Sequence, residues 1–205
     1  MSSPNLQQAV NHLYRTAVVD GSRTSTLRLS ALADYCAHQL QVRGIDGVEK
    51  EVPIPGGGRE KQWDIAWKLH GKYRLAVSLK SILRNLGGTV PNRIDDLIGE
   101  VANAQMYSPE IVIGYLIVFN TGEDSLSKKH NSTWSELMKS RLEGLSGRKA
   151  PFWSVGMIEA YGVVEVDFSQ GPKIISVESD LHQMFDTLID ELNFRHPSLA
   201  DSRDS

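Results

Sequence analysis

Residues 62–82, QWDIAWKLHGKYRLAVSLKSI, decide the fold that this sequence predicts. Extended runs at residues 62–69 and 73–82 are separated by His70-Gly71-Lys72, a pattern typical of a β-hairpin. Because side chains alternate along a strand, the second run has two different faces. One face carries Leu75, Val77 and Leu79 and is expected to join a core, and the other carries Ala76, Ser78 and Lys80.

The segments before the hairpin predict two helices and one strand. Apolar spacing indicates a weak helix at residues 7–17 and a stronger one at residues 27–42, whose apolar stripe includes Cys36. We interpret this single cysteine as a packing residue. A strand is expected at residues 48–54, ended by Pro55 and a three-glycine turn.

After the hairpin, residues 84–92 are predicted to form a polar loop and Asn92 to cap a helix that ends near Met106. Its buried stripe would be Ile94, Leu97, Ile98 and Val101. The apolar run at residues 111–119 predicts a strand covered on both faces. The remaining predictions are a loop at residues 121–131, a helix at residues 133–144 opened by a capping box, strands at residues 160–168 and 173–177, and a final helix capped by Asp180.

This order of elements predicts an α/β fold, with a central mixed sheet flanked by helices. We predict a single domain over residues 1–196 and a flexible tail over residues 197–205. The sequence contains no run of 18 apolar residues, and its N-terminus lacks the order of a signal peptide. We therefore expect a soluble cytoplasmic protein with no membrane partner.

The charge is unevenly distributed along the chain. The formal net charge is −3, yet residues 56–93 contain eight basic and two acidic residues, a net charge of +6. Residues 178–205 contain seven acidic and two basic residues, a net charge of −5. This division suggests a local polyanion site on an acidic body, although solvated surface charge is the simpler explanation.

One group of polar residues suits metal-dependent chemistry. Asp64 lies in the first hairpin strand, opposite the segment from Ser78 to Lys80, and the helix that follows carries Asp95, Asp96 and Glu100. Carboxylates around one lysine suit a hard divalent cation that polarises a phosphate. The alternative is a surface hairpin on which Asp64 and Lys80 form an ion pair.

This arrangement resembles the PD-(D/E)xK nuclease superfamily, and in particular its type II restriction endonucleases. The resemblance rests on Trp63-Asp64, on Ser78-Leu79-Lys80, and on the helix that begins with Asn92-Arg93-Ile94-Asp95-Asp96. It implies an αβββαβ core at about residues 27–119, with additional β and α elements at residues 132–196. Ser78 stands where the family usually has Asp or Glu, as in S-x-K variants that take this acid from the following helix.

The resemblance implies an endonuclease that uses Mg²⁺, for which Mn²⁺ can substitute, and that cuts double-stranded DNA to leave 5′-phosphate ends. Asp64, Ser78, Lys80, Asp96 and Glu100 would be catalytic. The metal ligands would be Asp64, the Leu79 carbonyl, and Asp96 or Glu100, with Asp95, Glu49 and Glu51 as weaker candidates. DNA would be bound by Arg59, Lys61, Arg84, Asn85, Asn92 and Arg93.

The expected partners are double-stranded DNA, a second copy in a homodimer and a cognate DNA methyltransferase. Two other enzyme functions remain open, a structure-specific nuclease resembling a junction resolvase and a defence nuclease. Two non-enzymatic readings are a catalytically inactive DNA-binding protein on the same fold and a scaffold with no nucleic-acid role.

Overall fold

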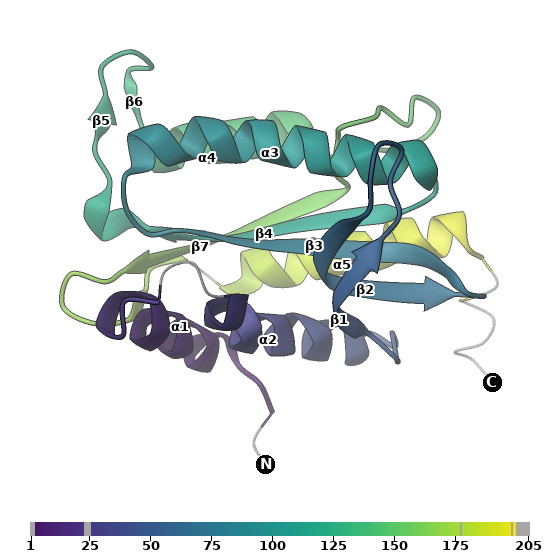
Figure 1. Ribbon diagram of the computed structural model, residues 1–205, viewed down its shortest axis with the longest axis horizontal. Helices are drawn as coiled ribbons and strands as arrows, with labels where there is room; N and C mark the ends of the chain where they lie inside the picture. The colour runs from purple at the N-terminus through teal and green to yellow at the C-terminus, as the bar shows by residue number, and fades with distance from the viewer. Residues whose placement is uncertain (1–2, 23–25, 177, 198, 200–205) are drawn as a thin grey trace.

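In a computed structural model, the chain forms a six-stranded mixed sheet between two layers of helices (Figure 1). The structure describes residues 3–22, 26–176, 178–197 and 199. Within them the strand order is β1-β2-β3-β4-β7-β8. The predicted α/β class, with a mixed central sheet flanked by helices, is confirmed.

The sheet combines an antiparallel meander with parallel strands. β1 (Glu49–Ile54), β2 (Lys61–Leu69) and β3 (Lys72–Ile82) pair antiparallel, and β3, β4 (Val112–Asn120) and β7 (Ala160–Asp167) pair parallel. The short β8 (Lys173–Ile174) closes the edge, and β5 (Leu126–Ser127) and β6 (Ser132–Thr133) form a separate ribbon. His70 and Gly71 have positive φ angles of 50° and 76° and connect the predicted hairpin.

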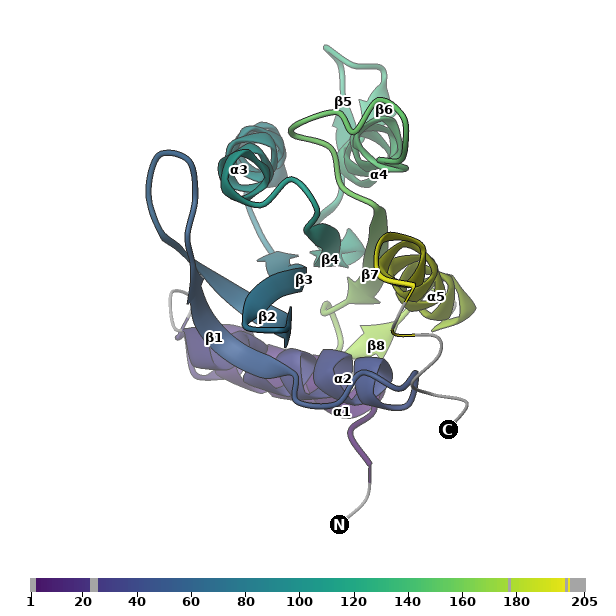
Figure 2. The same ribbon diagram turned by 90° about the vertical axis from the view of Figure 1, so that its right-hand side faces the viewer.

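In the part of the chain that the structure describes, five α-helices cover the two faces of the sheet. α3 (Leu86–Tyr107) and α4 (Trp134–Leu145) lie on one face, and α1 (Leu6–Tyr14), α2 (Ser30–Gln41) and α5 (Glu178–Arg195) lie on the other (Figure 2). Shorter helical segments are a π-helix at Arg15–Val19 and 3₁₀ turns at Thr26–Leu29 and Thr121–Glu123. We call the α3–α4 side the upper face and the α1–α2–α5 side the lower face.

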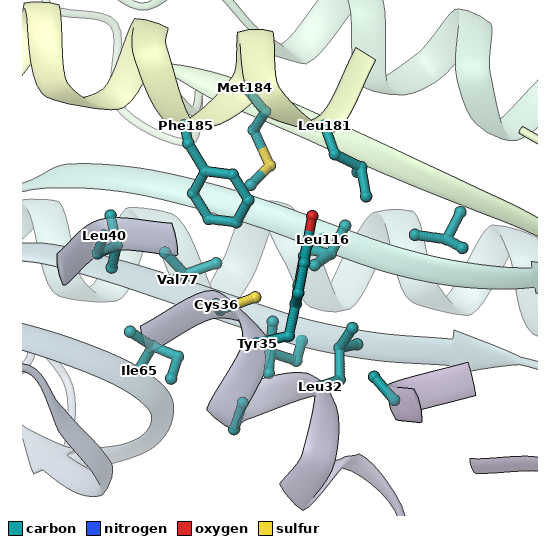
Figure 3. Packing of buried hydrophobic residues seen from close by; sticks show 14 of the residues in the cluster. Leu32, Tyr35, Cys36, Leu40, Ile65, Val77, Leu116, Leu181, Met184 and Phe185 are labelled. Atoms are coloured by element: carbon teal, nitrogen blue, oxygen red, sulfur yellow. The ribbon is translucent and has the colours of Figure 1, made fainter. Parts of the chain in front are cut away.

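Both faces of the central strands are buried, as the sequence predicts. All nine residues of β4 are buried. On β3, Leu75, Val77 and Leu79 join the lower core, whereas Ala76 and Ile82 join the upper core. Cys36 is 0% exposed and packs among lower-core side chains that include Leu40, Ile65, Val77 and Phe185, so its packing role is confirmed (Figure 3).

The predicted loop at residues 84–92 is wrong, because α3 begins at Leu86. Asn85, rather than Asn92, occupies the N-cap position, where its carbonyl accepts the N–H groups of Gly88 and Thr89. A Cβ atom on Gly87 would lie 3.0 Å from the Trp134 ring. Contact between α3 and α4 therefore favours a small residue that helix propensity disfavours.

Smaller corrections concern the ends and faces of other elements. Ile98 is 40% exposed, because it faces the groove between α3 and α4 instead of the sheet. α5 begins at Glu178, which accepts a hydrogen bond from the Tyr35 hydroxyl, so Asp180 lies in its first turn and does not cap it. β8 ends at Ile174, and Val177 lies outside the described residues.

Two other predictions concern segment ends. Thr133 and Glu136 form the predicted capping box at the start of α4. Most of the predicted tail lies outside the described residues. Leu199 is described and is 9% exposed within the lower core, so the chain still packs beyond residue 197.

Gly162 on β7 is expected to be required for the close approach of α5. An added Cβ would lie 2.6 Å from Leu181 Cδ2, and Leu116 and Met184 are also within 3.1 Å. Gly162→Val should therefore reduce the free energy of unfolding by about 1–3 kcal/mol, although valine is a good strand former. Urea unfolding measures this change. Gly144→Ala, which meets no atom within 4 Å on α4, is the control and should be neutral or stabilising. A stabilised Gly162→Val protein would contradict the close packing.

Candidate active site

β2 and β3 separate at one position, and the separation creates a fork in the sheet. Their ladder runs from the turn to the pair Ile65 and Val77. At the next step, Asp64 Oδ2 accepts the Leu79 N–H at 2.7 Å, so a side chain replaces the backbone partner. β3 continues beside β4 to Ile82, while the start of β2 stays paired with β1. We define the fork as the space between residues 61–64 and 79–82.

Four side chains meet at the base of the fork. Lys80 Nζ lies 3.5 Å from Glu100 Oε2 and 4.0 Å from Asp64 Oδ2. Ser78 Oγ donates a hydrogen bond to the same Glu100 oxygen at 3.3 Å. β2, β3 and α3 thus contribute Asp64, Ser78, Lys80 and Glu100, which we call the fork cluster.

The fork cluster is largely withdrawn from solvent. Ser78 is 1% exposed and Glu100 is 9% exposed, whereas the side chains of Asp64 and Lys80 retain 21% and 22% exposure. Burial raises the pKa of Asp64, while Lys80 and the Leu79 N–H act in the opposite direction. The charges of Glu51 and Glu100 raise this pKa further. Ionisation of Asp64 is therefore less favourable in the folded protein than in the unfolded chain.

The helix acids predicted for the metal site do not all reach this cluster. The Asp96 carboxylate is 60% exposed and forms an ion pair with Arg93 at 3.1 Å. Asp95 lines the groove between α3 and α4. Glu100 is the residue of α3 that contacts Ser78 and Lys80, one helical turn beyond Asp96.

The donor atoms at the fork fit a hard divalent cation. The Leu79 N–H points to Asp64, and the carbonyl of a strand residue points to the same side as its N–H, so the Leu79 carbonyl faces the fork. No three His, Cys, Asp or Glu side chains in the described part of the chain are grouped closely enough to hold a metal ion. Two carboxylates and one carbonyl suit Mg²⁺, because this ion usually keeps several waters and binds substrate phosphates.

Glu49 and Glu51, the weaker metal-ligand candidates on β1, differ in their distance from the fork cluster. Glu49 forms an ion pair with Lys68 at 3.1 Å. Glu51 is exposed and has a positive φ of 51°. On β1 it lies between Lys50, which pairs with Ile65, and Val52, which pairs with Trp63, so it is next to Asp64 across the two strands. Its negative charge contributes to the raised pKa of Asp64, after burial.

The predicted DNA-binding residues lie along α3 and the hairpin that approaches it. The 55–60 loop carries Arg59 and is attached to Asn103 near the end of α3, through Gly57 N–H at 2.8 Å and Gly58 N–H at 2.9 Å. A Cβ on Gly56 would lie 1.9 Å from the Asn103 side chain, which explains a glycine there. The others lie at the start of β2 and in or just before the first half of α3: Lys61, Arg84, Asn85, Asn92 and Arg93.

Tyr115 is a candidate residue that the sequence analysis missed. It is the β4 register partner of Ser78, and its buried hydroxyl has no hydrogen-bond partner among the described residues. Burial raises the pKa of this hydroxyl, and the charges of Glu100, Asp96 and Asp64 add to the effect. Its position within an unbroken apolar run gave no sign of this polar neighbourhood.

Comparisons with known proteins identify no relative of this sequence among protein families or curated proteins. None of the helices in the described residues has the length and apolar character that crossing a membrane requires.

Removal of the buried charge at Asp64 is expected to stabilise the protein. Because the folded-state pKa is raised, stability is lost as pH rises from the unfolded value through the folded value. Asp64→Asn can still accept the Leu79 N–H, so it should be more stable than the wild type at pH 7, with an advantage that shrinks toward pH 4. Denaturant unfolding at several pH values measures this.

Asp34→Asn provides the surface control, because Asp34 has 49% side-chain exposure and pairs with Lys50. It should change stability little at any of these pH values. A loss of stability in Asp64→Asn at pH 7 would show that the carboxylate is primarily structural.

Proposed function

We propose that the protein is a metal-dependent endonuclease of the PD-(D/E)xK type, and that it cuts double-stranded DNA as a type II restriction endonuclease does. The observation that carries this proposal is the convergence of Asp64, Lys80 and Glu100, with Glu100 bonded to the Ser78 hydroxyl. In this proposal, Glu100 from the following helix supplies the carboxylate that the family usually has at the position of Ser78.

Mg²⁺, or Mn²⁺ in its place, would be held by Asp64, Glu100 and the Leu79 carbonyl. When bound, such an ion neutralises phosphate charge and acidifies a coordinated water. Asp64 is fixed by its bond from the Leu79 N–H, and Glu100 is fixed by Ser78. These contacts hold both carboxylates in place before substrate arrives, which reduces the reorganisation that catalysis requires.

Lys80 supplies positive charge at the reacting phosphate. Its ammonium group lies between the two carboxylates and keeps 22% of its side-chain surface exposed toward solvent. From there it can orient an attacking water and stabilise charge that develops on the phosphate. Attack in line with the leaving oxygen yields a 5′-phosphate and a 3′-hydroxyl.

The basic residues outline a path for the DNA backbone. Arg84 and Asn85 lie just before the start of α3. The 55–60 loop, which carries Arg59, is hydrogen-bonded to Asn103 near the end of the same helix. Eighteen residues of helix separate Asn85 from Asn103, or about 27 Å at 1.5 Å per residue. That span is somewhat less than one turn of B-DNA, about 34–36 Å. Phosphate contacts of this kind position the duplex and leave base recognition to other loops.

The decisive test of the proposed chemistry is loss of Lys80. Lys80→Ala and Lys80→Met should both abolish Mg²⁺-dependent cleavage of plasmid and phage DNA, while circular dichroism at the assay temperature shows that the fold is retained. Lys68→Ala removes an exposed charge from β2 away from the fork and serves as the control. Discrete fragments from the wild type would support sequence-specific cutting, whereas cleavage confined to branched DNA would favour a junction resolvase. Wild-type activity in both Lys80 variants would reject the site.

A second prediction separates the two helix acids. Glu100→Gln should reduce cleavage by several orders of magnitude, because Glu100 contacts Lys80 and Ser78. Asp96→Asn should retain activity within a fewfold of the wild type, because its carboxylate faces solvent beside Arg93. Initial rates at saturating Mg²⁺ provide the comparison. The reverse order of effects would place Asp96 in the metal site instead.

A further inference from the structure

The outer edge of β7 is covered by the chain at its two ends and open between them. At one end, the Gly147 N–H bonds to the Glu159 carbonyl at 3.2 Å. At the other end, the Ile175 N–H bonds to the Glu165 carbonyl at 2.8 Å, and β8 pairs with the residues beyond it. Residues 160–164 lie between these contacts, and no described segment pairs with them on this side. We call this stretch the edge gap.

Two residues of the edge gap present unpaired backbone groups. Glu165 directs both its N–H and its carbonyl outward, where they bond to residues 175–176. Tyr161 and Val163 share this direction because backbone groups alternate along a strand, and the residues between them face β4. Their N–H groups and carbonyls have no partner among the described residues. Such an edge is a template for another strand, because only an extended backbone supplies donors and acceptors at the matching spacing.

The edge gap opens into a groove with room for a ligand. A cavity of about 630 Å³ lies over residues 161–163, within the range of about 300–1,000 Å³ that is typical of ligand sites. Lys139 of α4 lines one side, and Gln183 and Thr187 of α5 line the other. Figure 2 shows α4 above β7 and α5 beside it. The groove therefore extends the plane of the sheet, where an added strand would run.

The charge around the groove favours a basic segment. Lys139 pairs with Glu165 at 2.8 Å, so these two charges compensate each other. Asp180 lines the groove on α5, is exposed, and forms no ion pair within the described part of the chain. Burial, and then the negative charge of Glu143, raise the pKa of the Tyr161 hydroxyl, so a second acid lies near the groove. A positively charged side chain in the groove would be attracted to both acids.

We propose that the edge gap binds an extended segment of a partner protein, which adds to the sheet as an antiparallel strand with basic side chains toward α5. In an antiparallel pair, a hydrogen-bonded residue exchanges both its N–H and its carbonyl with the residue opposite. Tyr161 and Val163 would thus form four backbone hydrogen bonds. Their side chains pack on the upper face, so the added residues opposite them would face upward and the intervening ones would face Asp180. This site does not depend on the proposed nuclease.

Amide hydrogen exchange, measured residue by residue by NMR on the full chain without DNA or metal, tests the site. In the free protein, the amides of Tyr161 and Val163 should exchange rapidly, and those of Gly162 and Val164 slowly, because the latter face β4. The probe is an acetylated and amidated hexapeptide of alternating valine and lysine. It should slow exchange at Tyr161 and Val163 and leave the fold unchanged.

N-methylation of the peptide separates backbone pairing from side-chain contacts. Methylation of the valine amides removes the N–H groups that face β7 and should weaken binding by about tenfold or more. Methylation of the lysine amides alters only the outer edge of the added strand, so this matched control should bind within about threefold of the parent peptide. A larger loss from lysine methylation would overturn the antiparallel arrangement.

The acidic side of the groove is tested by substitution. At low salt, Asp180→Asn should weaken peptide binding by about two- to fivefold. Asp190→Asn is the control, because Asp190 is exposed on the same helix and does not line the groove. Equal binding by both variants and the wild type would overturn the preference for a basic segment.

Three results would overturn the peptide site itself. Slow exchange at Tyr161 and Val163 in the free protein would show that the edge gap is already closed. A peptide that leaves these amides unprotected at millimolar concentration would show that no strand adds there. Protection that increases with protein concentration alone would assign the edge gap to a second copy of the chain.

Discussion

The carboxylate of Asp64 accepts the Leu79 amide, and the rest of the fork depends on this one contact. A regular ladder would place a β2 backbone carbonyl there and close the sheet. Because the Leu79 N–H instead bonds to a side chain, the start of β2 separates from β3. It remains paired with β1, while β3 continues beside β4. The departure exposes the Leu79 carbonyl side of β3 and leaves room for Lys80 and Glu100 to meet Asp64.

Three carboxylates of this protein, Glu159, Asp64 and Glu100, differ in how completely their charge is compensated by the surrounding structure. Glu159 uses both oxygens on Arg148, Arg195 and a backbone amide, so removing it should leave buried guanidinium groups without a counter-charge. Asp64 and Glu100 instead share the charge of Lys80, and each accepts one hydrogen bond, from the Leu79 N–H and from the Ser78 hydroxyl. The excess negative charge of Asp64 and Glu100 over Lys80 is unfavourable for folding. A bound cation, or a metal ion that arrives with a phosphate, would neutralise it.

The sequence predicted the sheet and most of the cluster because these depend on local rules. Strand alternation places Ser78 and Lys80 on one face. The two-residue turn alone would set Asp64 opposite Val77, and the one-residue register shift between Trp67 and Lys68 moves it towards Ser78. The choice between Asp96 and Glu100 depends on how α3 lies across the sheet, which helical spacing does not determine. α3 begins at Leu86, earlier than its glycines predict, and at Gly87 a close approach to Trp134 requires a small residue that local helix propensity disfavours. Tyr115 gave no pattern, since strand pairing alone brings it beside Ser78. Glu51 was expected only as a weaker candidate, because its place beside Asp64 depends on how β1 pairs with β2.

The buried position of Cys36 has a practical consequence for experiments on this chain. Its thiol is 0% exposed, burial raises its pKa, and the sequence contains no other cysteine. Thiolate is the form that reacts with alkylating and disulfide reagents, so the native protein should resist them and the unfolded chain should not. The rate of thiol labelling would then report transient opening of the lower core, and the chain would carry its own probe of conformational fluctuation without any engineered label.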